Sequence, residues 1–274
     1  MINRIIPFSS VDGPGNRTAI FFQGCNFNCL YCHNPETINR CNNCGNCVDS
    51  CPTKALALEN EKLYWDKNIC INCDQCLKAC RRNSSPKALD ISVGAVIKEI
   101  EKRNSFISGV TASGGECTLQ HEFLVELFKR VKNLGLTTFI DTNGFIPLYE
   151  HPDLLEVMDM AMVDVKAYDS EEHKALTGMD NNMVLENVKF LAKMNKLYEI
   201  RTVIVPELLN NYYTVDMTSR FLASLNPNIR YKLIKYRQIG VREGFIDSYT
   251  PCHEYMEDLQ ELALNNGCKN VILV

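Results

Sequence analysis

Apolar residues repeat with two different periods along most of the chain. Short apolar runs bounded by turn residues predict strands, and longer segments with apolar residues three and four positions apart predict amphipathic helices. Residues 92–102, for example, place Val93, Val96, Ile97 and Ile100 on one helical face. The predicted strands cover residues 17–23, 106–111, 137–142, 160–166, 199–205, 230–236 and 270–274. The predicted helices cover residues 92–102, 119–131, 153–157, 171–176, 182–194, a segment ending near 225, and 253–264.

This alternation of strands and helices is typical of a parallel β-sheet, because each helix returns the chain to the start of the next strand. About six strand–helix units follow one another, fewer than the eight of a complete barrel. The pattern therefore predicts an α/β fold, a partial (βα)6 TIM-like barrel that is open on one side.

Residues 40–83 interrupt the alternation. Asn, Lys and Cys are frequent there, and few aliphatic residues remain to form a core. A segment this small can be stabilised by metal ligation where a hydrophobic core is lacking. We expect an inserted module over residues 40–83, within a barrel formed by residues 1–39 and 84–274.

Composition narrows the classes of function. The net charge of −4 argues against nucleic acid as a partner. No signal peptide is evident, and the most apolar segment, residues 158–165, contains Asp159 and Asp164 and is too short to span a bilayer. We therefore expect a cytoplasmic protein that binds neither nucleic acid nor membrane. In such a chain fourteen cysteines favour metal sites over disulfides, and eleven of them lie between Cys25 and Cys80.

Three cysteines, Cys25, Cys29 and Cys32, lie on the loop that follows the first predicted strand. Three thiolates can hold a cubane iron–sulfur cluster at three of its four irons, and the fourth iron then stays open for substrate chemistry. Residues 29–33 also match the c-type haem attachment pattern. That alternative requires export and leaves Cys25 without a role.

The insert contains two runs with the spacing of bacterial ferredoxins. The first run comprises Cys41, Cys44, Cys47 and Cys51 and is followed by Pro52. The second run ends at Cys80 and is followed by Arg81, where proline is usual. In two-cluster modules the fourth cysteine of each run binds the other cluster. We therefore assign one cluster to Cys41, Cys44, Cys47 and Cys80, and the other to Cys70, Cys73, Cys76 and Cys51. Zinc is the competing occupant, because paired C-x2-C sequences also form tetrahedral zinc sites.

Polar residues gather at the ends of the predicted strands. They occur at residues 113–116, 141–142, 164–166 and 235–237. The carboxyl ends of barrel strands form the active site in enzymes of this architecture. Met162, Asp164 and Lys166 also share one face of their strand by its two-residue period. We expect these groups to converge with the cysteine loop on one cavity.

These motifs together resemble the radical S-adenosylmethionine (SAM) superfamily. The resemblance rests on the C-x3-C-x2-C spacing and on Gly114-Gly115-Glu116 after the second strand. Residues 11–17, residues 31–35 and Asp141-Thr142-Asn143-Gly144 are similar to the glycyl radical enzyme activating enzymes, the pyruvate formate-lyase activating enzyme among them. The ferredoxin-like insert, residues 84–86 and residues 236–242 most resemble the YjjW-type activases.

The resemblance implies a role for individual positions. Cys25, Cys29 and Cys32 would hold the catalytic [4Fe–4S] cluster, and two further [4Fe–4S] clusters would occupy the insert. The implied SAM contacts are Tyr31, Gly114, Gly115, Glu116, Asp141, Lys166, Arg201 and Arg237. Short activases often carry histidine where this chain has Arg237. A monovalent-cation site is implied at Asp141, Thr142, Met162 and Asp164.

The activity implied by the resemblance is reductive cleavage of SAM to methionine and a 5′-deoxyadenosyl radical. That radical would remove a hydrogen from a backbone glycine of a partner glycyl radical enzyme, with a flavodoxin- or ferredoxin-type protein as reductant. No general acid or base is required. One alternative is a radical SAM enzyme acting on a small molecule or a peptide side chain. Another is a ferredoxin-type electron-transfer protein.

The remaining cysteines and histidines lack partners at ligand spacing in the sequence. We interpret Cys117, Cys252 and Cys268 as reduced, structural residues. We interpret His121, His151, His173 and His253 as solvated or capping side chains.

Overall fold

In the computed structural model, which describes residues 1–274, one eight-stranded sheet organises the chain. Its order is β1 (Ile2–Ser9), β2 (Arg17–Phe22), β5 (Gly109–Gly114), β6 (Thr137–Thr142), β7 (Met160–Asp164), β8 (Leu197–Ile204), β9 (Arg230–Lys235) and β10 (Val271–Leu273). β1 pairs antiparallel with β2, and all the other neighbours pair in parallel. β1 and β10 do not pair with each other, so the sheet does not close into a complete barrel.

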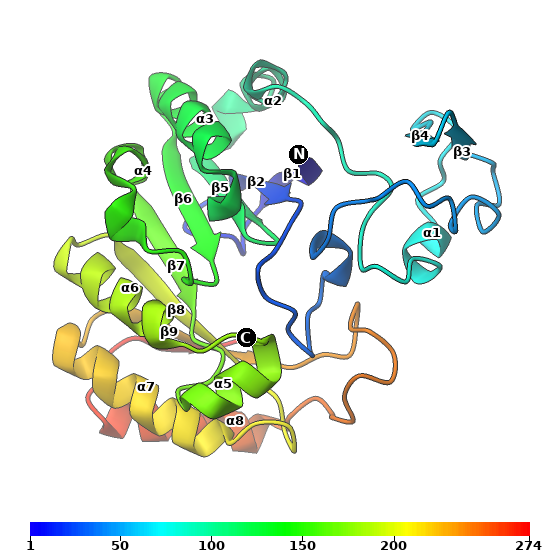
Figure 1. Ribbon diagram of the computed structural model, residues 1–274. Helices are drawn as coiled ribbons and strands as arrows, with labels where there is room; N and C mark the ends of the chain where they lie inside the picture. Colours follow the sequence, from blue (N-terminus) through cyan, green and yellow to red (C-terminus); the bar gives the residue numbers. More distant parts are fainter.

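Helices cover the outer face of this curved sheet (Figure 1). They are α2 (Val93–Glu101), α3 (His121–Asn133), α4 (Pro152–Val157), α5 (Ser170–Thr177), α6 (Asn182–Lys193), α7 (Asn211–Leu225) and α8 (His253–Asn265). All six residues of β2 are buried, as is usual for a strand covered on both faces. A cluster of 43 buried apolar residues fills the space between sheet and helices. None of the helices combines the length and apolar character that a membrane span requires.

The predicted α/β fold with a mostly parallel sheet is confirmed, and two strands of the eight-stranded sheet differ from the prediction. The strand predicted over residues 106–111 forms at Gly109–Gly114, because residues 104–106 make a short 3-10 helix that leaves Phe106 exposed. β1 was not predicted, because its apolar residues do not alternate regularly with polar ones. It forms by pairing with β2 at the edge of the sheet.

Residues 40–83 extend away from the rest of the chain (Figure 1). They contain a hairpin of β3 (Leu56–Glu59) and β4 (Lys62–Trp65) and the short helix α1 (Gln75–Lys78). Asn60 and Glu61 take positive φ at the hairpin turn, as a tight two-residue connection requires. Where the segment joins the barrel, a bridge pairs Asn39 with Ser84. The two ends of the segment therefore meet at one point.

Candidate functional site

A cavity of about 190 Å³ lies at the carboxyl ends of the central strands. Residues from the loop after β2, the ends of β5 and β6, and the segment after β7 line it. Among them are Cys25, Cys29, Cys32, Gly114, Asp141 and Lys166. The structure therefore brings together side chains that are more than 140 positions apart in the sequence.

The three cysteines of the β2 loop all face this cavity. Burial raises the pKa of the Cys25 thiol to about 12 and that of Cys29 to about 11. A thiol of this kind becomes a thiolate only when a metal binds it and displaces its proton. The loop itself is held by backbone hydrogen bonds from Asn28 to Thr177 and from Leu30 to Leu176. Arg242 also donates to the carbonyl of Cys29 at 2.8 Å.

Two glycines allow the end of β5 to approach the cysteine loop. Gly114 has a φ of 113°, and a Cβ at this position would lie 2.2 Å from the backbone nitrogen of Phe22. A Cβ on Gly115 would lie 2.2 Å from the carbonyl oxygen of Gly24. In the space left by the missing side chains, the Glu116 amide donates to Gly24 at 2.8 Å. Only glycine permits this backbone approach.

Glu116 lies behind the cavity wall and does not line the cavity. The side chain is fully buried, and its oxygens accept four hydrogen bonds from nitrogen and oxygen donors. Two come from Thr118, one from the Thr142 hydroxyl and one from the Asn143 amide. Burial raises the pKa of Glu116, and these hydrogen bonds oppose that shift. The carboxyl group thus ties the loop after β5 to the loop after β6.

Asp141 faces the cavity and forms an ion pair behind it. Its Oδ1 lies 3.1 Å from Nη1 of Arg201, which does not line the cavity. Burial raises the pKa of Asp141 to about 6, although the Arg201 charge acts in the opposite direction. Its Oδ2 accepts a hydrogen bond from the Ser113 hydroxyl at 2.9 Å.

Glu199 is the residue of this region that the sequence analysis missed. It is buried on β8 and lies within 2.6 to 2.8 Å of Arg201, Arg230 and Lys232. Burial alone would raise the pKa of Glu199, but its cationic neighbours, Arg201 first among them, lower it. The sequence did contain one sign of this ion pair: Glu199 and Arg201 are two residues apart, which places both side chains on one face of a strand.

The four positions of the implied cation site do lie near one another, and basic side chains contact three of them. Arg201 contacts Asp141, and its Nη2 donates to Sδ of Met162 at 2.9 Å. Lys166 Nζ lies 2.8 Å from Asp164. The Thr142 hydroxyl donates to Glu116. Met162 is fully buried and does not line the cavity.

Tyr31 and Arg237 differ in their position relative to the cavity. Tyr31 lines the cavity, its ring lies 5.9 Å from Nζ of Lys166, and its buried hydroxyl has no hydrogen-bond partner. Arg237 is exposed just beyond β9 and does not line the cavity. Its carbonyl lies 2.9 Å from Nε2 of His33.

The insert brings its cysteines together in two places. Cys51, Cys70, Cys73 and Cys76 line one small pocket beside Trp65. This pocket joins the last cysteine of the first run to three of the second run. Around Cys47, burial first and then the nearby thiols of Cys76, Cys41 and Cys80 raise its pKa to about 11. Cys44 is exposed.

The sequence profile of the radical SAM superfamily matches residues 19–212. This chain belongs to the radical SAM superfamily. Its relatives further place it among the glycyl radical enzyme activating enzymes. The matched residues include the cysteine loop after β2 and the strands that carry the cavity.

The alignments with three relatives cover most of this chain and most of each relative. A putative glycyl-radical enzyme activating enzyme of Haemophilus influenzae is 28% identical over 100% of this chain and 96% of its own. The 4-hydroxyphenylacetate decarboxylase activating enzyme of Clostridioides difficile strain CD196 is 31% identical over 97% and 94%. The pyruvate formate-lyase 1-activating enzyme of Escherichia coli K12 is 32% identical over 88% and 83%.

Solved structures share the fold. A domain of a pyruvate-formate lyase-activating enzyme from Bacteroides vulgatus matches with a TM-score of 0.52 at 22% identity, over 61% of this chain and 99% of its own. A radical SAM methyltransferase from Sphaerobacter thermophilus matches with a TM-score of 0.59 at 10% identity, over 100% and 76%. At these identities the likeness concerns the fold alone.

Proposed function

We propose that this radical SAM activase cleaves SAM at a cluster held by Cys25, Cys29 and Cys32 and uses the product to activate a glycyl radical enzyme. The observation that carries the proposal is the convergence of the thiols of Cys25, Cys29 and Cys32 with Asp141 and Lys166 on one cavity. The loop after β2, the end of β6 and the segment after β7 supply these groups, so the arrangement is a property of the fold rather than of one motif.

The groups lining the cavity suit a [4Fe–4S] cluster with SAM bound to it. Three thiolates ligate three irons and leave one iron for the amino-acid end of SAM. Lys166 supplies a cation for the SAM carboxylate, and Asp141 supplies an anion for its amino group. The free hydroxyl of Tyr31 is available as a further donor to the ligand.

A reduced cluster with SAM bound would supply the electron that splits SAM into methionine and a 5′-deoxyadenosyl radical, and this radical would take a hydrogen atom from the α-carbon of a partner's glycine to give 5′-deoxyadenosine. The chain's own residues position the reactants. Gly114 and Gly115 offer backbone groups that no side chain covers. Arg201 acts through Asp141, which it orients from behind the wall. Arg237 is exposed, and we assign it to the rim of the site.

For Glu116 we propose an indirect role. Both of its oxygens already accept hydrogen bonds from the loops that they join. We therefore propose that Glu116 fixes the wall against which the SAM amino group binds. For Asp141, Thr142, Met162 and Asp164 we propose that a monovalent cation competes with Arg201 and Lys166 for the same oxygen and sulfur atoms.

We also propose two [4Fe–4S] clusters in the insert. The fourth cysteine of each run would bind the cluster held by the first three cysteines of the other run. The shared pocket of Cys51, Cys70, Cys73 and Cys76 supports one of the two sets.

Electrons would reach the cavity from a flavodoxin- or ferredoxin-type protein, with the insert clusters as a relay. The partner's glycine loop would enter where β1 and β10 leave the sheet open. All fourteen cysteines are free, which supports a reducing cytoplasmic location for the protein.

The test is anaerobic reconstitution with iron and sulfide, followed by SAM and dithionite. We expect 5′-deoxyadenosine from the protein alone. With a glycyl radical enzyme encoded beside it, we expect a glycine-centred doublet in electron paramagnetic resonance (EPR). The Cys29→Ala variant is the negative control. Deoxyadenosine without the doublet would point to a small-molecule or peptide substrate, and absence of both would leave a ferredoxin-type protein.

A further inference from the structure

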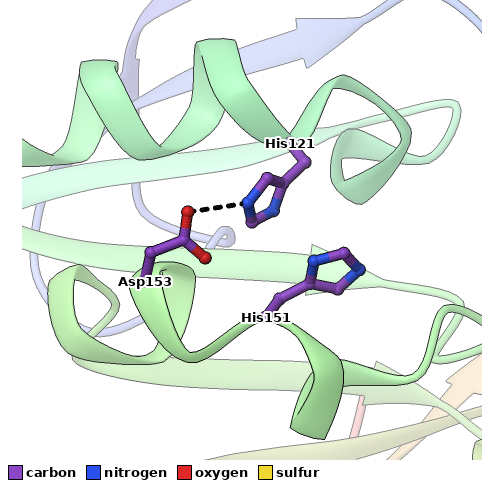
Figure 2. A group of neighbouring side chains, drawn as sticks. All are labelled: His121, His151 and Asp153. Atoms are coloured by element: carbon purple, nitrogen blue, oxygen red, sulfur yellow. Dashed lines mark hydrogen bonds and ion pairs between the residues drawn. The ribbon is translucent and has the colours of Figure 1, made fainter.

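Outside the cavity, the structure brings two histidines and an aspartate together. Figure 2 shows His121 at the start of α3, with His151 and Asp153 at the start of α4. Nε2 of His121 lies 2.9 Å from Oδ2 of Asp153. The imidazole rings of His121 and His151 are 4.3 Å apart between centroids. One ligand atom from each of the three residues lies within 4.8 Å of the other two.

We propose that His121, His151 and Asp153 bind a divalent transition-metal ion, with Zn²⁺ as the expected occupant. Two imidazole nitrogens and one carboxylate oxygen are the ligand types that Zn²⁺ accepts, with water completing the coordination. Imidazole ligands argue against Mg²⁺ and Ca²⁺, which take oxygen ligands.

The geometry requires only a small adjustment. Ligands around tetrahedral zinc, at bond lengths near 2.1 Å, lie about 3.4 Å apart. The 2.9 Å contact between His121 and Asp153 already brings two ligand atoms that close. His151 is partly exposed and Asp153 is exposed, so side-chain rotation can bring the third ligand atom into place.

The hydrogen bonding of these histidines differs from that of two other histidines of the chain. His33 and His173 each bond to a backbone carbonyl, which fixes the ring. His121 bonds only to Asp153, and its buried Nδ1 has no partner. His151 forms no side-chain hydrogen bond. The rings therefore remain available to a metal, and our sequence-based interpretation of His121 and His151 as solvated or capping residues is revised.

The three side chains lie at the points where the loops after β5 and β6 lead into α3 and α4. His121 follows Glu116 by five residues, and His151 follows Asn143 by eight. Glu116 and Asn143 are themselves hydrogen-bonded at 2.7 Å. None of the three proposed ligands lines the cavity. A metal here would therefore act as a structural clamp between the α3 and α4 starts, and would not take part in the reaction.

The experiment uses Co²⁺ as the probe on the reconstituted holoenzyme. Its oxidised [4Fe–4S]²⁺ clusters have no net spin, so high-spin Co²⁺ can be observed by EPR without interference. One equivalent of Co²⁺ is added anaerobically, and the protein is desalted. We expect one bound Co²⁺ per chain, with pulsed-EPR couplings to the nitrogen atoms of two imidazoles, and a rise in melting temperature.

His151→Gln and Asp153→Asn should each weaken Co²⁺ binding at least about tenfold, the loss found when metal sites lose even supporting groups. They should also abolish the rise in melting temperature. His253→Gln is the matched control, because His253 is an exposed histidine at the start of α8. Iron content and circular dichroism verify that each variant has folded.

Equal Co²⁺ binding by wild type and both variants would overturn the proposal, as would the absence of imidazole couplings or of any retained Co²⁺. Because the readout needs neither SAM nor turnover, its result is independent of the activase assignment.

Discussion

The backbone amide of Asn143 donates a hydrogen bond to Oε2 of Glu116 over 2.7 Å. The Asn143 side chain in turn donates to Oδ1 of Asn26, at 2.8 Å, beside Cys25 in the cysteine loop. One buried carboxyl group therefore links the loop after β5 to the loop after β6, and through it to the proposed cluster ligands. This relationship explains how a residue outside the cavity can control its shape.

Replacing Glu116 with Gln tests this link. The amide keeps the size of the side chain but turns one acceptor into a donor that faces donors from Thr118, Thr142 or Asn143. A buried polar group left unpaired costs about 1–3 kcal/mol, so we expect a lower unfolding midpoint and weaker SAM binding. Glu122→Gln is the control, because Glu122 is exposed on α3. Equal midpoints for the two variants would contradict the structural role of Glu116.

Gly115→Ala should prevent correct assembly of the cysteine loop. Its added Cβ would lie 2.2 Å from the Gly24 carbonyl oxygen and 2.8 Å from that of Thr37, and backbone atoms cannot easily move aside. We expect low iron content after reconstitution and at least a tenfold loss of deoxyadenosine formation. Gly94→Ala is the matched control, because its nearest contact is the side chain of Arg130 at 3.7 Å. Normal iron content in Gly115→Ala would show that the loops can separate without loss of the site.

Glu199→Gln should destabilise the β8–β9 region and disturb Asp141 from a distance. The change leaves Arg201, Arg230 and Lys232 without their shared anion. Breaking a buried ion pair from one side costs on the order of 3–5 kcal/mol. Chemical denaturation measures this loss, and SAM titration measures the effect on Asp141. Exposed Glu126, paired with Arg130 on α3, offers Glu126→Gln as the control with little expected effect.

SAM binding should depend on pH through Asp141. Burial raises the pKa of Asp141 to about 6 in the folded protein, above its usual value of 3.8. The ionised form is therefore the disfavoured one, and this group's contribution to stability falls as pH rises through 6. If the carboxylate accepts the SAM amino group, SAM affinity should instead fall as pH drops from 7.5 to 5.5. Asp141→Asn should bind SAM weakly and without this pH dependence; the same pH profile in both proteins would remove Asp141 from the site.

The cysteines of the cavity and those of the insert should differ in how much their loss affects SAM cleavage. Cys29→Ala should abolish SAM cleavage, because it removes one of the three ligands facing the cavity. Cys44→Ala should lower iron content but retain some cleavage driven by dithionite, which can reduce the first cluster directly. Cys252→Ala is the control, because Cys252 is exposed and outside both groups. Iron analysis and deoxyadenosine assays report the result, and a Cys44 variant with wild-type iron content would refute the insert assignment.

Much of this protein follows from short-range pattern. The helices over α2, α3 and α6 were predicted because their buried residues repeat with the helical period, as Val93, Val96, Ile97 and Ile100 do. The cysteine spacings are equally local, since ligands to one cluster from one run must lie a few residues apart. β1 escaped prediction because its pairing with β2, rather than its own pattern, stabilises it.

The sequence by itself determined the alternating α/β architecture, because helical and strand periods are visible within a few consecutive residues, and its cysteine spacings predict the insert and the cysteine sets. Only the tertiary structure decided that Glu116 faces Asn143 rather than the cavity, that Glu199 gathers three cations, and that His121 meets His151. Those contacts depend on how parallel strands and their loops align in space. A neighbour more than about twenty-five residues away leaves no periodic trace in the sequence, yet it sets the burial and the charge that each side chain experiences.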